Sequence, residues 1–306
     1  MTRAVVFAYH NVGVRCLRVL VAHGLQICRV VTHQDNPNET IWFESVAQAA
    51  RDCDLAVITP ADPNAEAIVQ EVAACKPGFI FSFYYRQMLG TPMLALPPRG
   101  ALNMHGSLLP KYRGRVPVNW AVIHGEHETG ATLHYMVEKP DAGDIVAQTA
   151  VPILPDDTAK EVFDKVTVAA ELTLDRTLPA LLAGTAPRTR QDPARASYFG
   201  GRKPEDGIID WAQSAATIHN LVRALSPPYP GARTLLAGRP ARLLRTRVLD
   251  ASSREAPAIA VEEGRTVAYC GAGGKLAVLS LEIDGASIEP AAFERRFGVC
   301  RIAPGN

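Results

Sequence analysis

Short apolar runs alternate with helical patterns through the first half of the chain. Four of the runs predict strands, at residues 4–8, 27–32, 54–59 and 79–83. Helices are expected between them at 13–23 and 65–74. Apolar strands that alternate with helices indicate a parallel sheet covered on both faces. The pattern therefore predicts an α/β fold with a Rossmann-like, mainly parallel sheet, on which ligands bind at the carboxyl ends of the strands.

The second half of the chain predicts a change of fold. A long helix is expected at 158–183, and residues 185–204 are rich in Pro, Arg, Gly and Ser, which is typical of a domain boundary. Beyond them, an amphipathic helix at 214–225 and short runs separated by glycine predict a small antiparallel barrel or sandwich, and we expect an OB-like β-barrel. These runs lie at residues 242–244, 259–261, 266–269 and 276–283. We expect three parts: a catalytic domain at 1–190, a linker at 191–203 and the barrel domain at 204–306.

The composition is that of an ordinary globular protein with a hydrophobic core. Of the 306 residues, 47% are hydrophobic and 21% are charged, and the net charge is +1. This charge gives no overall attraction to nucleic acid or to an anionic membrane, and no apolar run approaches the roughly 20 residues that span a bilayer. The apolar N-terminus resembles a buried strand more than a signal peptide, so we expect a cytoplasmic protein with no nucleic-acid or membrane partner.

Motifs for metals and common nucleotides do not occur in the sequence. The six cysteines form no C-x-x-C pair, and no Cys/His cluster has the spacing of metal ligands. We therefore expect reduced thiols and no metal. The pattern G-x-G-x-x-G and the Walker pattern are both missing, so NAD and P-loop ATP chemistry are not indicated.

One segment carries a candidate site. Residues 101–104 predict a strand, and Asn103 and His105 are two positions apart, so both side chains can face one pocket near its carboxyl end. An amide donor beside an imidazole can polarise a carbonyl group and move a proton. On these residues alone, the alternative of a buried histidine beside a strand-end asparagine stays open.

Three ordered signatures resemble a known family. The run Asn-Met-His-Gly-Ser-Leu-Leu-Pro at 103–110 is followed by Arg-Gly at 113–114, and Asp-Ala-Gly at 141–143 follows a predicted strand at 130–137. A third signature begins with Gly-Ile-Ile-Asp-Trp at 207–211. Together they resemble the 10-formyltetrahydrofolate-dependent formyltransferases. The resemblance spans nearly the whole chain and implies a one-carbon group transferase.

Further segments resemble one branch of this family, the formyltransferase domains of bifunctional polymyxin-resistance enzymes. The segments lie at residues 5–10, 32–37, 81–86 and 111–115. These domains formylate the 4-amino group of UDP-4-amino-4-deoxy-L-arabinose on the route to modified lipid A in lipopolysaccharide. The resemblance implies the same nucleotide-sugar acceptor, with 10-formyltetrahydrofolate as co-substrate. A homo-oligomer or a separate decarboxylase is the partner that it suggests.

The resemblance also implies roles for individual residues. Asn103 would donate to the developing oxyanion, His105 would transfer the proton, and Asp141 would stabilise the imidazolium. The folate would bind against two loops and one arginine: Gln87, Met88, Leu89, Arg115, Val137, Glu138, Lys139, Pro140 and Asp141. The acceptor would meet Tyr85, Arg86 and Arg115.

Two other acceptors are weighed against this one. Methionyl-tRNA formyltransferases carry a basic insertion after the second strand, whereas residues 34–40 contain no Lys or Arg. The near-zero net charge also disfavours a tRNA substrate. Another sugar N-formyltransferase, acting on a dTDP- or GDP-linked amino sugar, would share the same pocket chemistry. A catalytically inactive binding protein is a further alternative, against which the three intact candidate residues argue. A deformylase is another, and members of that family usually carry a different accessory domain.

Overall fold

The computed structural model describes residues 2–37 and 39–302, so the two ends of the predicted domains, Met1 and Asn306, lie outside the described residues. The chain divides into two compact units, each made of several segments. The first comprises Met1–Pro117, Glu128–Val151 and Phe163–Gly200, and the second comprises Val118–His127, Pro152–Val162 and Gly201–Asn306. Among the described residues, each unit contains one seven-stranded sheet.

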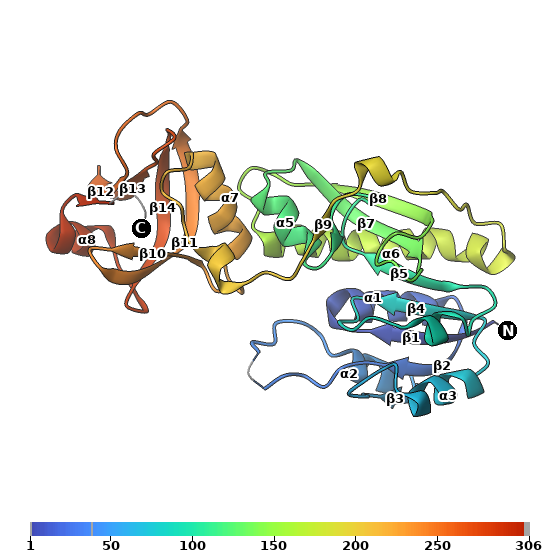
Figure 1. Cartoon of the computed structure of the whole chain (residues 1–306). Coiled ribbons are helices and arrows are strands. Elements are labelled where there is room, and N and C mark those ends of the chain that lie inside the picture. The colour runs from blue at the N-terminus through green and yellow to red at the C-terminus, as the bar shows by residue number, and fades with distance from the viewer. Residues whose placement is uncertain (1, 38, 303–306) are drawn as a thin grey trace. The chain divides into compact units, whose positions relative to one another are not determined.

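The first unit contains the predicted mainly parallel sheet (Figure 1). Its strand order is β3-β2-β1-β4-β5-β7-β8. The strands are β1 (Arg3–Ala8), β2 (Gln26–Val31), β3 (Val57–Ile58), β4 (Phe79–Phe83), β5 (Ala101–His105), β7 (Glu128–Tyr135) and β8 (Ile145–Pro152). The pairings from β3 through β5 are parallel, and β5 pairs with β7 antiparallel. The predicted α/β fold class is confirmed.

Most predicted elements of this unit occur within two or three residues of their expected bounds. The strand expected at 54–59 is shorter, because Asp54 adopts a left-handed backbone with φ of 56° and the strand begins only at Val57. The helices are α1 (His10–Ala22), α2 (Val46–Arg51), α3 (Glu66–Ala74), α4 (Thr91–Leu94) and α6 (Ala159–Ala183). Helix α1 begins three residues earlier than predicted, directly after β1, where His10 Nδ1 accepts the N–H of Asn11.

Buried side chains on both faces explain why the strands are apolar throughout. Val5 and Phe7 on β1 pack with Ile80 on β4 and with Val72 of α3 on one face. Helix α6 runs along β7 and β8 (Figure 1), where Thr173 Oγ1 donates to Thr149 Oγ1 at 2.6 Å. Helices over a two-sided apolar sheet leave its carboxyl edge as the place for polar chemistry.

The second unit contains the predicted antiparallel sheet, which curls into a half-barrel (Figure 1). Its strand order is β10-β11-β14-β13-β12-β16, with β15 (Ala286–Ser287) beside β14, and the described residues show no pairing between β10 and β16. The strands are β10 (Ala232–Leu236), β11 (Arg239–Asp250), β12 (Ala258–Glu262), β13 (Arg265–Tyr269), β14 (Lys275–Ile283) and β16 (Cys300–Arg301). All four predicted runs fall inside these strands.

Helix α7 (Ala215–Leu225) supplies much of the second core, as its apolar stripe predicts. Ile218, Val222 and Leu225 are buried against the sheet, and Ser214 Oγ caps the helix by accepting the N–H of Thr217. The unit also contains α5 (Pro117–Ile123) and α8 (Pro290–Phe297). None of the helices in the described part of the chain combines the length and apolar character needed to cross a membrane.

Candidate active site

Strand β5 places the two candidate side chains at its carboxyl end. Asn103 lies opposite His134 of β7, and His105 lies opposite Thr132, in an antiparallel register. His105 is only 6% exposed. The predicted strand is confirmed, and its two-residue period directs both side chains to the same region.

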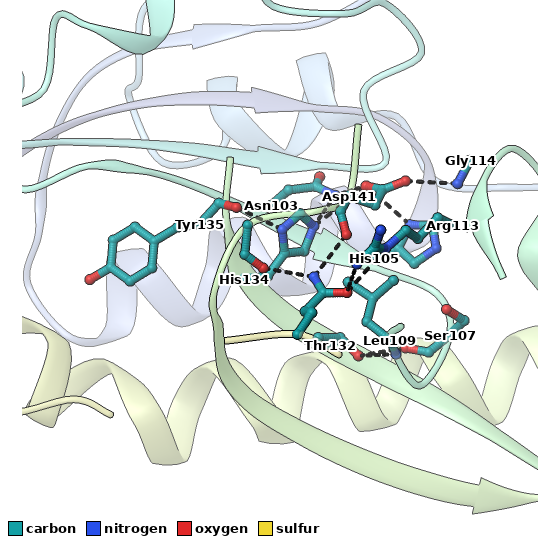
Figure 2. A network of polar contacts seen from close by, with 12 residues as sticks. Asn103, His105, Ser107, Leu109, Arg113, Gly114, Thr132, His134, Tyr135 and Asp141 are labelled. Carbon is teal, nitrogen blue, oxygen red and sulfur yellow. Dashed lines mark hydrogen bonds and ion pairs between the residues drawn. The ribbon is translucent and has the colours of Figure 1, made fainter. Parts of the chain in front are cut away.

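Asp141 brings the candidate residues together around one carboxylate (Figure 2). Its Oδ1 atom lies 3.6 Å from His105 Nδ1, 3.4 Å from Asn103 Nδ2 and 3.4 Å from His134 Nε2. Its Oδ2 atom accepts the backbone N–H of Gly114 at 2.8 Å. Residues 38 positions apart in the sequence, Asn103 and Asp141, therefore form one polar cluster.

The environment of Asp141 favours its charged form. Burial by itself raises the pKa of this carboxyl group, but its electrostatic interactions with the His105 and His134 rings and the hydrogen bond from the backbone N–H of Gly114 outweigh burial. The net result is a pKa of Asp141 well below its ordinary value. The cluster thus has a permanent negative charge beside His105 at neutral pH.

Backbone geometry assigns the protons of His105. Its Nε2 atom lies 2.8 Å from the carbonyl oxygen of Tyr112. A carbonyl oxygen only accepts, so Nε2 carries the hydrogen and donates it. Nδ1, which faces Asp141, is therefore the ring nitrogen that can gain or release a proton.

His134 is a member of the cluster that sequence reasoning did not include. Its Nδ1 atom donates to the carbonyl oxygen of Tyr135 at 2.8 Å. Its Nε2 atom accepts from Asn103 Nδ2 at 3.1 Å when the ring is neutral, and can donate to Asp141 when the ring is protonated. The antiparallel pairing of β5 with β7 was the signal that could have identified it.

The loop after β5 is held by side chains from two neighbouring strands. Thr132 Oγ1 donates to the carbonyl oxygen of Ser107 at 2.6 Å and accepts the N–H of Leu109 at 3.2 Å. Gln148 Nε2 donates to Thr132 Oγ1 and to the carbonyl oxygen of Leu109, at 2.8 and 2.9 Å. These bonds fix the path that carries Tyr112 and Gly114 back to His105 and Asp141.

Two glycines of the signatures are required by close backbone approaches. A Cβ atom at Gly114, whose φ is +97°, would lie 2.2 Å from the carbonyl oxygen of Phe199. A Cβ atom at Gly143 would lie 2.0 Å from the carbonyl oxygen of Tyr135. Glycine is the residue that permits both contacts, which explains the Arg-Gly and Asp-Ala-Gly patterns physically.

The residues predicted to meet folate lie on two loops with different degrees of exposure. Gln87 Nε2 donates to the carbonyl oxygen of Ala61 at 2.8 Å, Met88 is 56% exposed, and Leu89 is buried in the core. Val137, Glu138, Lys139 and Pro140 are all exposed. Side-chain contact with a ligand is therefore open to Met88 and to the 137–140 loop, whereas Leu89 has only its backbone to offer.

The residues predicted to bind the acceptor differ in how many contacts their side chains make with the rest of the protein. Arg86 forms an ion pair with Glu39, with two N···O distances of 2.7 and 2.6 Å. Tyr85 stacks on His33 with ring centroids 4.1 Å apart, and burial raises the pKa of Tyr85 to about 12. Arg115 is exposed, and its backbone N–H donates to Phe199 at 2.9 Å.

His33 holds Tyr85 and Arg86 in place, and its imidazole ring is neutral. Burial, together with the nearby charge of Arg86, lowers the pKa of His33 to about 4. Its Nε2 atom accepts the backbone N–H of Arg86 at 3.0 Å. Arg86 also lies over the ring of Tyr9, 4.6 Å from its centroid. Tyr85 and Arg86 are thus held by side chains that follow β1 and β2.

Comparison with sequence families identifies the chain. The sequence model described as formyl transferase matches residues 11–178, and the model of the formyl transferase C-terminal domain matches residues 202–297. The chain belongs to the formyl transferase family. This formyltransferase is therefore an enzyme of one-carbon group transfer, and the resemblance of the three signatures is confirmed at the level of the family.

Solved structures share the fold of this formyltransferase. An N-formyltransferase from Helicobacter canadensis, in complex with folinic acid and dTDP-3-aminofucose, is 19% identical, with a TM-score of 0.72 over 91% of this chain and 99% of that one. WlaRD, a sugar 3N-formyl transferase with dTDP and 5-N-formyl-THF, is 19% identical, with a TM-score of 0.70 over 90% and 97%. A 4-N formyltransferase from Francisella tularensis is 18% identical, with a TM-score of 0.62 over 76% and 91%.

Proposed function

We propose that this formyltransferase moves the formyl group of 10-formyltetrahydrofolate to the 4-amino group of a nucleotide-linked amino sugar. The observation that carries the proposal is that Asn103 and His105, at the C-terminal end of β5, both lie beside the carboxylate of Asp141. A chain of the formyl transferase family with this cluster has a proton acceptor, an amide donor and a fixed negative charge within a few ångströms.

Each side chain of the cluster has a distinct part in the proposed reaction. The acceptor amine must attack the formyl carbon as a free base, and the formyl oxygen then becomes an oxyanion. His105 takes the amine proton on Nδ1, opposite Asp141, while its Nε2–H stays bonded to Tyr112. The protonated ring then returns the proton to the departing folate nitrogen.

Asn103 is proposed as the donor to the oxyanion. Its Nδ2 hydrogens are directed to His134 at 3.1 Å and to Asp141 at 3.4 Å. The longer bond is the weaker one and is the one that the formyl oxygen would replace as negative charge develops. Asp141 keeps its bond to Gly114 during this exchange, so the carboxylate stays in place.

Folate as the co-substrate is supported by the relatives that share the fold. The Helicobacter canadensis enzyme holds folinic acid, and WlaRD was solved with 5-N-formyl-THF. We propose that the folate meets the backbone of 87–89, the exposed loop 137–140, Asp141 and Arg115, as the family resemblance implies. Met88 and the 137–140 loop offer the exposed side chains for this contact.

UDP-4-amino-4-deoxy-L-arabinose is the acceptor that we propose. The resembling segments 5–10 and 81–86 include the ends of β1 and β4, and segment 32–37 directly follows β2. These three strands pair in parallel and so end at one edge of the sheet. Tyr85 and Arg86 follow β4 at this edge, and Arg115 offers a guanidinium for the diphosphate. The proposed setting is lipid A modification and polymyxin resistance in the cytoplasm.

We place this chemistry in a catalytic domain at 1–190, with an accessory domain at 204–306. The family matches, at 11–178 and 202–297, support this division. The segment between them, proposed as a linker at 191–203, contains η1 (Pro193–Arg195) and β9 (Tyr198–Phe199).

A dTDP-linked amino sugar is the second acceptor to consider, because the Helicobacter canadensis relative holds dTDP-3-aminofucose. The deciding experiment offers the purified protein 10-formyltetrahydrofolate with UDP-4-amino-4-deoxy-L-arabinose, dTDP-3-aminofucose or methionyl-tRNA, and identifies the formylated product by mass spectrometry. We expect the UDP sugar to be formylated with the highest kcat/KM. Preference for the dTDP sugar would move the proposal to that acceptor, and formylation of the tRNA alone would overturn it.

A further inference from the structure

Gln191 is a buried side chain whose hydrogen bonds go to the backbone of the loop that carries Asp141 and to the side chain of Arg113. It is 6% exposed and lies 50 residues away from Asp141 in the sequence. Its Nε2 atom donates to the carbonyl oxygens of Asp141 and Gly143, at 2.8 and 2.7 Å. Its Oε1 atom accepts from Nε and from Nη2 of Arg113, at 3.1 and 2.6 Å.

Arg113 occupies the position between the two residues whose backbones contact the cluster. Tyr112 accepts from His105 Nε2, and Gly114 donates to Asp141 Oδ2. The Arg113 side chain is itself only 3% exposed, and its third bond goes to the hydroxyl of Tyr198 at 2.7 Å. Gln191 therefore links the segment 112–114, which contacts His105 and Asp141, to the loop that carries Asp141.

We propose that Gln191 is a positioning residue that sets the Asp141 carboxylate against His105 Nδ1. It acts through the backbone of Asp141 on one side and through Arg113 on the other, and has no part in proton transfer. This inference rests on the proposed function, because its effect on rate is an effect on the chemistry assigned to His105 and Asp141.

The hydrogen-bond partners of Gln191 fit a glutamine side chain in one orientation of its amide group. The carbonyl oxygen must face the guanidinium donors, and the amide nitrogen must face two acceptors. Glutamate has nearly the same shape and keeps the bond to Arg113, but it directs an oxygen at two carbonyl oxygens. Methionine has a similar length and removes both sets of bonds.

The segment that carries Gln191 is itself fixed at both ends. Before it, Thr189 and Ile145 exchange both backbone hydrogen bonds at 2.8 Å. After it, Ser197 Oγ accepts the N–H of Tyr112 at 2.9 Å, and β9 pairs in parallel with β6 (Arg113–Gly114). A side chain held by an ordered segment can transmit a defined position, since a misplacement of about 1 Å can cost on the order of 100-fold in rate.

The test compares three variants of the full chain: Gln191→Glu, Gln191→Met and the control Thr173→Val. Thr173 is a buried polar residue of α6 in the same unit, and its hydroxyl is hydrogen-bonded to Thr149 and to the carbonyl oxygen of Ala169 rather than to a residue of the cluster. The measurements are kcat, KM for both substrates, the melting temperature, and the amide hydrogen exchange of Gly114. The last needs no substrate, because Gly114 N–H is protected by Asp141 Oδ2.

We expect kcat of Gln191→Glu and Gln191→Met to fall about 30- to 100-fold, with both KM values changed less than about threefold. We also expect Gly114 to exchange about tenfold faster or more, while Thr173→Val loses thermal stability but keeps wild-type kcat and Gly114 exchange. If Gln191→Glu folds and retains wild-type kcat and Gly114 exchange, the inference is wrong. A wild-type protein that transfers no formyl group would instead contradict the proposed function, and the Gly114 exchange would still decide whether Gln191 positions Asp141.

Discussion

His105 Nδ1 lies 3.6 Å from Asp141 Oδ1, while the opposite ring nitrogen of His105 lies 2.8 Å from the carbonyl oxygen of Tyr112. The imidazole is therefore held between a charged acceptor and a neutral one. The proton that enters or leaves the ring in the proposed reaction must do so on the side of the carboxylate.

Asn103→Ala should lower kcat by about 100- to 1000-fold, because the developing oxyanion loses its amide donor.

His105→Ala should lower kcat by a similar or larger factor, since general base catalysis contributes roughly 100- to 10,000-fold. Steady-state kinetics with both substrates saturating measure the effect. The control is His23→Ala, which removes a histidine at the end of α1 and should keep kcat within about twofold of wild type. A folded His105→Ala protein with near-normal turnover would refute the assignment.

Asp141→Asn should reduce the free energy of unfolding by about 1 to 3 kcal/mol at pH 7, because a buried carboxylate loses charge-assisted bonds. Since the pKa of Asp141 is depressed in the folded protein, its ionisation stabilises the native state above the ordinary aspartate pKa of about 3.9. That stabilisation is lost progressively as the pH falls below this value. Urea unfolding at pH 7 and pH 3 measures the difference in free energy of unfolding between wild type and Asp141→Asn. We expect this difference to be smaller at pH 3 than at pH 7; a difference that stays constant or grows would contradict the depressed pKa.

Gly114→Ala should destabilise the protein by more than about 1 kcal/mol and reduce activity, because the positive φ of Gly114 is strained for alanine and the added Cβ would lie 2.2 Å from Phe199 O. The matched control is Gly200→Ala, where an added Cβ has no neighbour within 4 Å. Thermal melts and kcat of the two variants provide the comparison. Equal stability of the two alanine variants would show that the 112–115 segment can adjust.

Arg115→Ala should raise KM for the nucleotide sugar about tenfold with little change in kcat, because an exposed guanidinium that meets phosphate contributes to binding more than to the transition state. Raising the salt concentration should raise the KM of the wild-type enzyme for the sugar until it approaches that of the variant. Arg195→Ala, which removes another exposed arginine of the first unit, serves as the control. An unchanged KM for the sugar would remove Arg115 from the acceptor site.

The sequence pattern predicted the sheet well because its strands are buried on both faces and uniformly apolar. It was less successful at β3, where Asp54 turns the backbone, and at β10 and β16, which are short or carry alternating polar residues. The half-barrel was predictable from short runs separated by glycine. Its strand order, in which β14 lies between β11 and β13, depends on long-range pairing that no local pattern contains.

The candidate site was predictable in part. The two-residue spacing explains why Asn103 and His105 share a region, whereas Asp141 was identified by resemblance to the family. Gln191 could not be found in this way, because a glutamine in a segment rich in Arg and Pro looks like part of a linker. Two of its partners are backbone carbonyl groups, which have no sequence signature, and its contact with Arg113 joins residues 78 positions apart.

The most direct test of the account follows the formyl carbon itself. Purified wild-type protein and His105→Ala would receive isotope-labelled 10-formyltetrahydrofolate and UDP-4-amino-4-deoxy-L-arabinose, and NMR would record the labelled carbon over time. We predict that the label appears as a formamide on the sugar with wild type and stays on the folate with His105→Ala. Release of the label as free formate by wild type, or equal transfer by both proteins, would contradict it.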